Sequence, residues 1–230
     1  MFKRPIMDLS PPPYPSIHPN LKQLHALNFD FLHALQVVQR SESRSSHHSL
    51  RLSELTAKPL LTCDQTALQR IASCSFSLFS LQWHRIDEWT QLAEHSAATR
   101  SKMSSKLDTQ APPDEATALV LHFMQCAVFF GWHLAQHEEQ TARFMLGMSP
   151  ETATVVRTLD LWQCRYISQH HRKLLAPRWL HNRYFWPDLL HYGRSGEPEH
   201  LKLVQLLGTQ LMAQDLEPSA IARHTIADND

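Results

Sequence analysis

The sequence predicts a mainly α-helical protein, and three observations support this class. Only five of the 230 residues are glycine, which argues against an all-β fold rich in tight turns. Hydrophobic residues make up 43% of the chain, enough for a large core. Apolar residues recur at helical spacing in three long segments, 21–39, 114–146 and 198–214.

The chain divides into an arm, two helical domains and a linker. Residues 1–20 contain six prolines, which favour an extended arm. Residues 97–113 are rich in Ser, Lys and Thr and end in two prolines, so we interpret them as a linker. This leaves an N-terminal helical domain at 21–96 and a C-terminal helical domain at 114–230, which ends in an acidic tail.

In the N-terminal domain, the helix at 21–39 is followed by a polar loop at 40–49. A second helical region begins near Thr62 or Asp64, either of which can act as N-cap. The segment 76–83 alternates in part between apolar and polar residues, which is compatible with extended structure. Residues 83–92 return to helical spacing.

In the C-terminal domain, the segment 114–146 is the strongest helix prediction, and Gly147 is a natural stop. The run Ser149, Pro150, Glu151 supplies an N-cap, a proline and an acid for a short helix that ends at Arg157. Asp160 can cap a third helix over 161–171. Prolines 177 and 187 are expected to break the segment that follows, and 198–214 forms the last helix.

A weak internal repeat relates the two domains. Residues 71–83 align with 167–179 without a gap, so that Trp83 matches Trp179. A shift of two residues then brings Leu92 onto Leu190. Chance is the alternative, because Leu and Trp matches are frequent in an aromatic-rich chain. If the repeat is real, the protein consists of two tandem copies of one helical unit.

The sequence offers little support for catalysis or for metal binding. The four cysteines lack CxxC spacing, and no nucleophile, phosphate-loop or dinucleotide motif is present. His133 and His137 are one helical turn apart, but no third ligand has a diagnostic spacing. We therefore expect a protein that is not an enzyme and that carries no cofactor or metal.

The apolar runs also suggest no membrane segment. The run Cys126–Phe130 is much shorter than a bilayer-spanning helix, and the N-terminus lacks the apolar stretch of a signal peptide. A cytoplasmic location with reduced cysteines is the simplest interpretation.

The most informative segment is 157–183. It holds six Arg or Lys and one acid, a surplus of five positive charges in a chain whose net charge is zero. Aromatic residues lie among these cations, a combination that is typical of proteins that bind phosphates. The candidate nucleic-acid-binding residues are Arg157, Arg165, His170, His171, Arg172, Lys173, Arg178 and Arg183. Base reading would fall to His170, His171 or Arg172; the alternative is a solvated helix face beside a core.

The segment from Trp132 to Leu190, with the acidic turn and last helix that follow it, resembles the D subunit of the bacterial flagellar master regulator, the FlhD type. The matching positions are Leu134-Ala135-Gln136, then Ala142, Phe144, Leu146 and Gly147, then Ser149, Glu151 and Ala153, then Leu159, Leu161 and Gln163, and finally Glu197, Glu199 and Leu201. Residues 60–92 look like a second, more divergent copy of the later part of that unit. Because the chain is about twice as long as such a subunit, the resemblance implies a tandem or fused form.

The resemblance implies a helical, DNA-binding transcriptional activator. It would act with an FlhC-like partner subunit and with RNA polymerase, as a homo- or hetero-oligomer. A rival hypothesis fits the same composition: a non-catalytic interaction module or accessory component of a secretion or conjugation apparatus, whose basic segment faces an acidic partner.

Overall fold

The computed structural model describes residues 18–41, 48–102 and 113–216, and it is mainly α-helical. Residues 1–17 of the predicted proline-rich arm, most of the predicted linker and residues 217–230 of the acidic tail lie outside the described residues. The last two residues of the predicted arm, Pro19 and Asn20, instead begin α1. The elements, in chain order, are α1 (Pro19–Arg40), η1 (His48–Leu50), α2 (Glu54–Leu61), α3 (Gln65–Ala72), β1 (Phe79–Ser80), α4 (Ile86–Lys102), α5 (Glu115–His137), α6 (Glu139–Leu146), α7 (Pro150–Thr158), α8 (Leu161–His170), η2 (Arg172–Leu174), β2 (Ala176–Pro177), α9 (Phe185–Ser195) and α10 (Pro198–Leu216).

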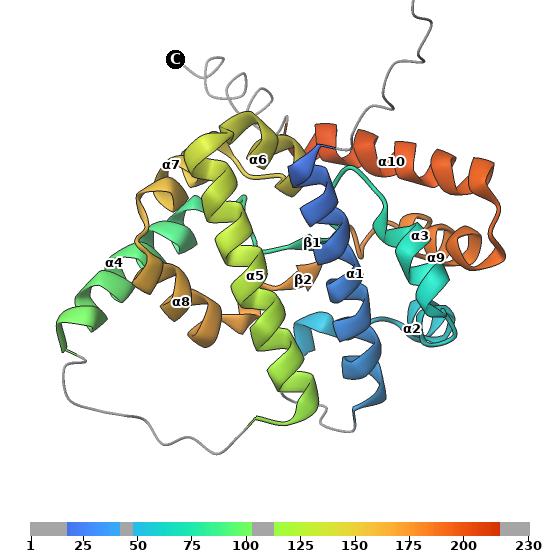
Figure 1. Cartoon of the computed structure of the whole chain (residues 1–230), viewed down its shortest axis with the longest axis horizontal. Coiled ribbons are helices and arrows are strands. Elements are labelled where there is room, and N and C mark those ends of the chain that lie inside the picture. The colour runs from blue at the N-terminus through green and yellow to red at the C-terminus, as the bar shows by residue number, and fades with distance from the viewer. Residues whose placement is uncertain (1–17, 42–47, 103–112, 217–230) are drawn as a thin grey trace, which may run out of the picture.

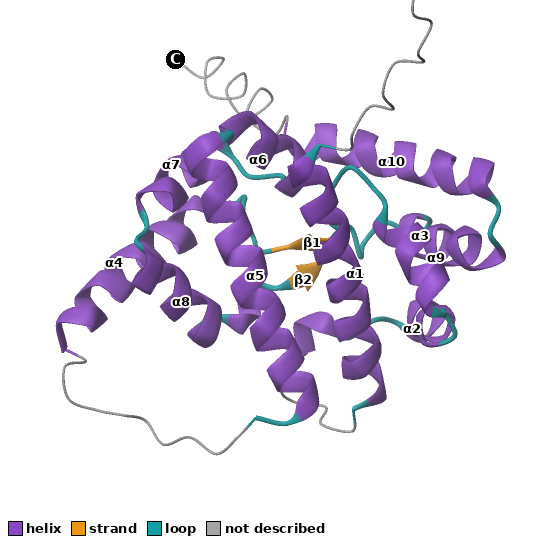
Figure 2. Ribbon diagram, in the orientation of Figure 1, coloured by secondary structure: helices purple, strands orange, loops and turns teal. Residues whose placement is uncertain are grey.

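The two longest helices, α1 and α5, lie side by side at the centre of the molecule (Figure 1). Behind them, β1 and β2 form a short antiparallel pair in which Phe79 faces Pro177 and Ser80 faces Ala176 (Figure 2). Phe31, Phe79 and Phe123 meet at this point, with ring centroids 4.9 to 5.7 Å apart. The residues of both predicted domains therefore share one hydrophobic core.

Several helix starts agree with the sequence analysis because the predicted caps form. Asp64, rather than Thr62, is the N-cap of α3, and its carboxylate accepts from the Ala67 N–H at 2.7 Å. The Ser149 hydroxyl caps α7 by accepting from the Thr152 N–H at 3.1 Å. Each cap satisfies a backbone N–H that the first turn of a helix leaves unpaired.

Three predicted boundaries are wrong. The helix expected over 114–146 is divided at Glu138, whose carboxylate accepts from Asn20 on α1 at 2.8 Å. The linker expected over 97–113 begins later, because α4 continues to Lys102. The break expected at Pro187 does not occur, since Pro187 is the third residue of α9, where its missing N–H needs no partner.

The arrangement of helices in residues 19–72 recurs in residues 115–170. Helices α1, α2 and α3 begin at Pro19, Glu54 and Gln65, and helices α5, α7 and α8 begin 96 residues later, at Glu115, Pro150 and Leu161. The buried residues correspond as well: Leu24, Leu27 and Phe31 on α1 match Val120, Phe123 and Ala127 on α5. The N-caps Ser53 and Asp64 match Ser149 and Asp160.

Side-chain hydrogen bonds recur at the same offset. The Gln36 side chain donates to the carbonyl of Cys63 at 3.0 Å, and the Trp132 indole donates to the carbonyl of Leu159 at 2.8 Å. Residue 132 lies 96 positions after 36, and 159 lies 96 positions after 63. In both halves, a side chain of the long helix (α1 or α5) therefore bonds to the backbone just after the first short helix (α2 or α7).

The correspondence extends through the strands with one added residue, an offset of 97, so the ungapped alignment of 71–83 with 167–179 is wrong over the strands. Trp179 corresponds to Gln82 and not to Trp83, and both Gln82 and Trp179 have a positive φ. The Trp89 indole donates to the carbonyl of Leu81 at 3.3 Å, and the Trp186 indole donates to the carbonyl of Arg178 at 2.6 Å. Each pair is eight residues apart, and both indoles are buried. Each buried tryptophan therefore closes the turn between a strand and the helix after it.

The helices that follow the strands are exchanged between the halves. Helix α4 packs on α7 and α8 of the later half, and α9 packs on α2 and α3 of the earlier half. Figure 1 shows α4 on the left among the later helices, and α9 on the right beside α2 and α3. Neither half can therefore bury its core without a helix from the other.

Helix α5 is long and apolar enough to cross a membrane, by length and composition. About half of the residues in its most apolar window are buried inside the protein. Helix α5 packs on α1, α6, α7 and α8. The prediction of no membrane segment is based on apolar runs such as Cys126–Phe130, which are shorter than α5.

The exchange predicts how a cut chain behaves. If a protease site is placed within 103–112 and cleaved after folding, the two fragments should co-elute at the size of the intact chain, because α4 and α9 each pack on the other fragment. Size-exclusion chromatography with and without denaturant tests this. Separation of the fragments in native buffer would contradict the exchange.

A second prediction concerns Asn28, which is fully buried on α1. Its side chain donates to the carbonyls of Ala72 (3.2 Å) and Phe76 (2.9 Å) and accepts from the Leu78 N–H (2.9 Å). Asn28→Leu keeps the branching at Cγ but leaves these groups unpaired, so the free energy of unfolding should fall by about 3 kcal/mol. Urea denaturation measures it. The control, Gln23→Leu on the exposed face of α1, should change it by less than about 0.5 kcal/mol.

Candidate nucleic-acid interface

Helix α8 and the turn that follows it carry five of the eight predicted residues, and the start of α8 is fixed by a capping box. Asp160 accepts from the Gln163 N–H at 2.8 Å, and the Gln163 side chain accepts from the Asp160 N–H at 2.9 Å. The Gln163 amide also donates to the carbonyl of Ala93 on α4 at 2.9 Å, and Arg100 of α4 pairs with Asp160. Helix α8 is thereby locked to α4.

Three rings stack along one side of α8. Trp162, Tyr166 and His170 are four residues apart, so they lie above one another on the helix. The centroids of Trp162 and Tyr166 are 5.2 Å apart, and those of Tyr166 and His170 are 4.3 Å apart. Nδ1 of His170 lies 2.9 Å from the carbonyl of Tyr166. Trp162 and Tyr166 are half-buried and His170 is exposed, so part of this stack faces solvent.

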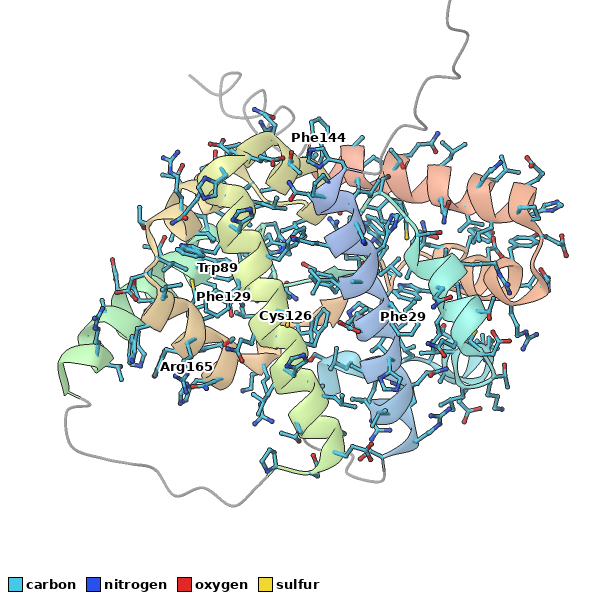
Figure 3. The ribbon with its side chains drawn as sticks, in the orientation of Figure 1. Phe29, Trp89, Cys126, Phe129, Phe144 and Arg165 are labelled. Atoms are coloured by element: carbon cyan, nitrogen blue, oxygen red, sulfur yellow. The ribbon has the colours of Figure 1, made fainter. Side chains whose placement is uncertain are left out.

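Five predicted residues lie together on α8 and the turn that follows it. Arg165, His170 and Lys173 are exposed, and His171 and Arg172 are half-buried. Figure 3 shows Arg165 on the outer side of α8, away from the core. These five residues lie on α8, on η2 and at His171 between them, and we refer to them as the basic edge.

His171 contributes less charge to the basic edge than its type suggests. Burial lowers the pKa of His171 below its ordinary value, and the neighbouring His170 and His95 lower it further, while Glu88 raises it. The imidazole is therefore mainly neutral at neutral pH. Arg165, Arg172 and Lys173 supply the permanent positive charge.

Arg157 and Arg183 lie on other elements. Arg157 is exposed in the last turn of α7, and its carbonyl accepts from the Gln136 amide at 3.4 Å. Arg183 is exposed in the loop before α9, next to Tyr184, whose exposed fraction is 69%. Both side chains are accessible, but neither belongs to the basic edge.

Arg178 is buried, with an exposed fraction of 6%, so the structure does not place it on the predicted interface. Its Nη2 donates to the carboxylate of Asp215 at 2.9 Å, and its guanidinium lies 4.6 Å from the centroid of the Trp179 ring. The Trp179 indole donates to the same carboxylate oxygen at 2.8 Å. Arg178 thus joins β2 to the end of α10.

The pKa of Arg178 supports this structural role. Burial lowers it to about 10, and Asp215 opposes the shift. The guanidinium therefore stays protonated at neutral pH, as the ion pair requires. Sequence analysis did not connect Arg178 with Asp215, because the 37 residues that separate them give no local signal.

The metal candidates His133 and His137 gain no third ligand among the described residues. His133 and His137 lie on the exposed side of α5 with ring centroids 4.8 Å apart. Across residues 18–41, 48–102 and 113–216, no three His, Cys, Asp or Glu side chains gather to hold a metal. Burial raises the pKa of Cys74 and Cys164 to about 12, so both remain thiols.

The ion pair predicts a non-additive pair of substitutions. Asp215→Ala leaves the buried Arg178 charge unpaired and should lower the free energy of unfolding by about 2 kcal/mol, because an isolated buried charge is costly. Adding Arg178→Met removes that charge and should recover part of the loss. Chemical denaturation of both variants and of Arg178→Met tests this. Simple additivity would argue against the pair.

No family model matches the chain, and neither a curated protein nor a solved structure does. The resemblance to the FlhD type therefore depends on the sequence motifs alone.

Proposed function

We propose that this protein binds nucleic acid through the basic edge and acts as a transcription regulator. The observation that supports the proposal is the combination, on α8 and η2, of three permanent cations with a partly exposed stack of rings. Cations neutralise phosphates, and aromatic faces accept unstacked bases. The capping box and the contacts with α4 hold both in place before binding.

The residues divide by role. Arg165, Arg172 and Lys173 contact phosphates, which positions the protein without reading sequence. His170, at the exposed end of α8, is the residue that reaches a base edge through Nε2, since its Nδ1 already bonds to the carbonyl of Tyr166. Arg157 and Arg183 add phosphate contacts where the nucleic acid extends past the basic edge.

The family resemblance narrows the proposal to a DNA-binding activator in the bacterial cytoplasm. In that hypothesis, the chain holds two copies of an FlhD-type unit and acts with an FlhC-like partner and RNA polymerase. The recurring helix starts and hydrogen bonds support the two-copy organisation.

A second candidate is a non-catalytic interaction module. Leu203 and Leu206 are exposed on the outer face of α10, and Phe144 is exposed on α6. Large apolar side chains that gather on a surface are typical of protein contacts. In this hypothesis, the basic edge binds an acidic protein instead of DNA.

Substitution of the three cations tests DNA binding. Arg165→Ala, Arg172→Ala and Lys173→Ala together should weaken binding to duplex DNA and reduce the slope of log K against log salt by about 3, since about one counterion is released per phosphate contact. Arg172→Ala with Lys173→Ala should reduce the slope by about 2. Fluorescence anisotropy at several salt concentrations measures both.

The matched control removes the same charge elsewhere. Lys58→Ala, Arg85→Ala and Lys202→Ala eliminate three exposed cations that pair with nearby acids on α2, α4 and α10. This control should leave the slope close to that of the unaltered protein. An unchanged slope in the basic-edge variant would remove these residues from the interface, and salt-insensitive capture of an acidic protein would favour the second candidate.

A further inference from the structure

Helix α10 packs at a defined place on the half that contains α2, α3 and the exchanged helix α9. The ring of His200 on α10 stacks on that of Tyr192 on α9, with centroids 4.9 Å apart. Further along, Gly208 packs so closely on Phe76 that a Cβ would lie 2.1 Å from the Phe76 ring. Helix α10 therefore lies across the surface between Tyr192 on α9 and the segment that precedes β1.

The corresponding place in the other half is open. Tyr192 corresponds to His95 by the offset of 97 that relates Trp89 to Trp186. Ser75 and Phe76, which line a pocket with Thr209 and Met212 of α10, correspond to His171 and Arg172 by the offset of 96. A groove of about 720 Å³ lies between these counterparts, and we refer to it as the α4 groove. It is lined by Glu88, Gln91, Glu94, His95, Ala98 and His171.

A local difference explains why this chain leaves the groove open. Helix α9 ends at Gly196, whose φ of 75° lets the chain turn back so that α10 can fold over α9. The counterpart of Gly196 is Thr99, which lies inside α4 and continues the helix to Lys102. In the part of the chain that the structure describes, α4 packs on α7 and α8, and no helix takes the place that α10 takes on α9.

We infer that the α4 groove binds a basic amphipathic helix of a partner protein, in the place that corresponds to that of α10. Glu88 and Glu94 line the groove, but Glu88 already pairs with Arg85 at 3.3 Å. Glu94, which is exposed like Gln91 and Ala98, is therefore the acid that a cationic helix would meet. Leu92 at its floor supplies an apolar contact. A cationic helix complements this surface, whereas its acidic residues repel phosphates, so the inference does not rest on DNA binding.

A designed peptide tests the α4 groove without the natural partner. The probe is a labelled peptide of the α10 sequence, residues 198–216, with Glu199→Lys, Gln205→Lys, Gln210→Lys and Asp215→Lys. It should bind the full chain in the micromolar range, as measured by fluorescence anisotropy, and shift the amide resonances of Gln91 and His95. The peptide with the native α10 sequence should bind about tenfold more weakly, because its charge does not complement the groove.

Charge reversal at Glu94 gives the decisive comparison. Glu94→Lys should weaken binding of the lysine-substituted peptide about tenfold, whereas Glu54→Lys on α2, which makes the same charge change, should not. Thermal unfolding verifies that both variants fold. Absence of saturable binding, or binding that Glu94→Lys leaves unchanged, overturns the inference. Self-association of the chain that Glu94→Lys abolishes would also overturn it, since the occupant would then be a second copy.

Discussion

The exchange of α4 and α9 across the central α1–α5 pair is the constraint on which the rest of the structure depends. Each exchanged helix is held by a buried indole that bonds back to the residue before the turn, Trp89 to Leu81 and Trp186 to Arg178. Because α4 completes the later half, α8 rests on it through Gln163 and Asp160. The position of the basic edge therefore depends on a helix from the earlier half.

Sequence analysis could predict what depends on local chemistry. The mainly helical class, the caps at Asp64, Ser149 and Asp160, and the start of α10 at Pro198 follow from residue spacing and from side chains that satisfy nearby N–H groups. The division of 114–146 could not be predicted, since it involves a contact from Glu138 to Asn20, 118 residues away. A fold in which two segments exchange helices has no local signature.

The candidate site shows the same limit. The cluster of Arg165, His170, Arg172 and Lys173 is adjacent in sequence, so composition was enough to find it. Arg178 belongs to the same run, yet its side chain turns inward to Asp215. A count of charges cannot separate a cation that faces solvent from one that ties a strand to a helix. Burial decides this, and burial is set by the whole fold.

The exchange of helices has a consequence for synthesis of the chain. Helices α2 and α3 pack on α9, which is translated more than 100 residues after them. While the ribosome makes the later half, the earlier half holds an apolar surface that nothing yet covers. Folding must therefore wait until residue 195 has left the ribosome, and contacts this distant in sequence form slowly. The nascent chain is a natural client for a chaperone during that interval.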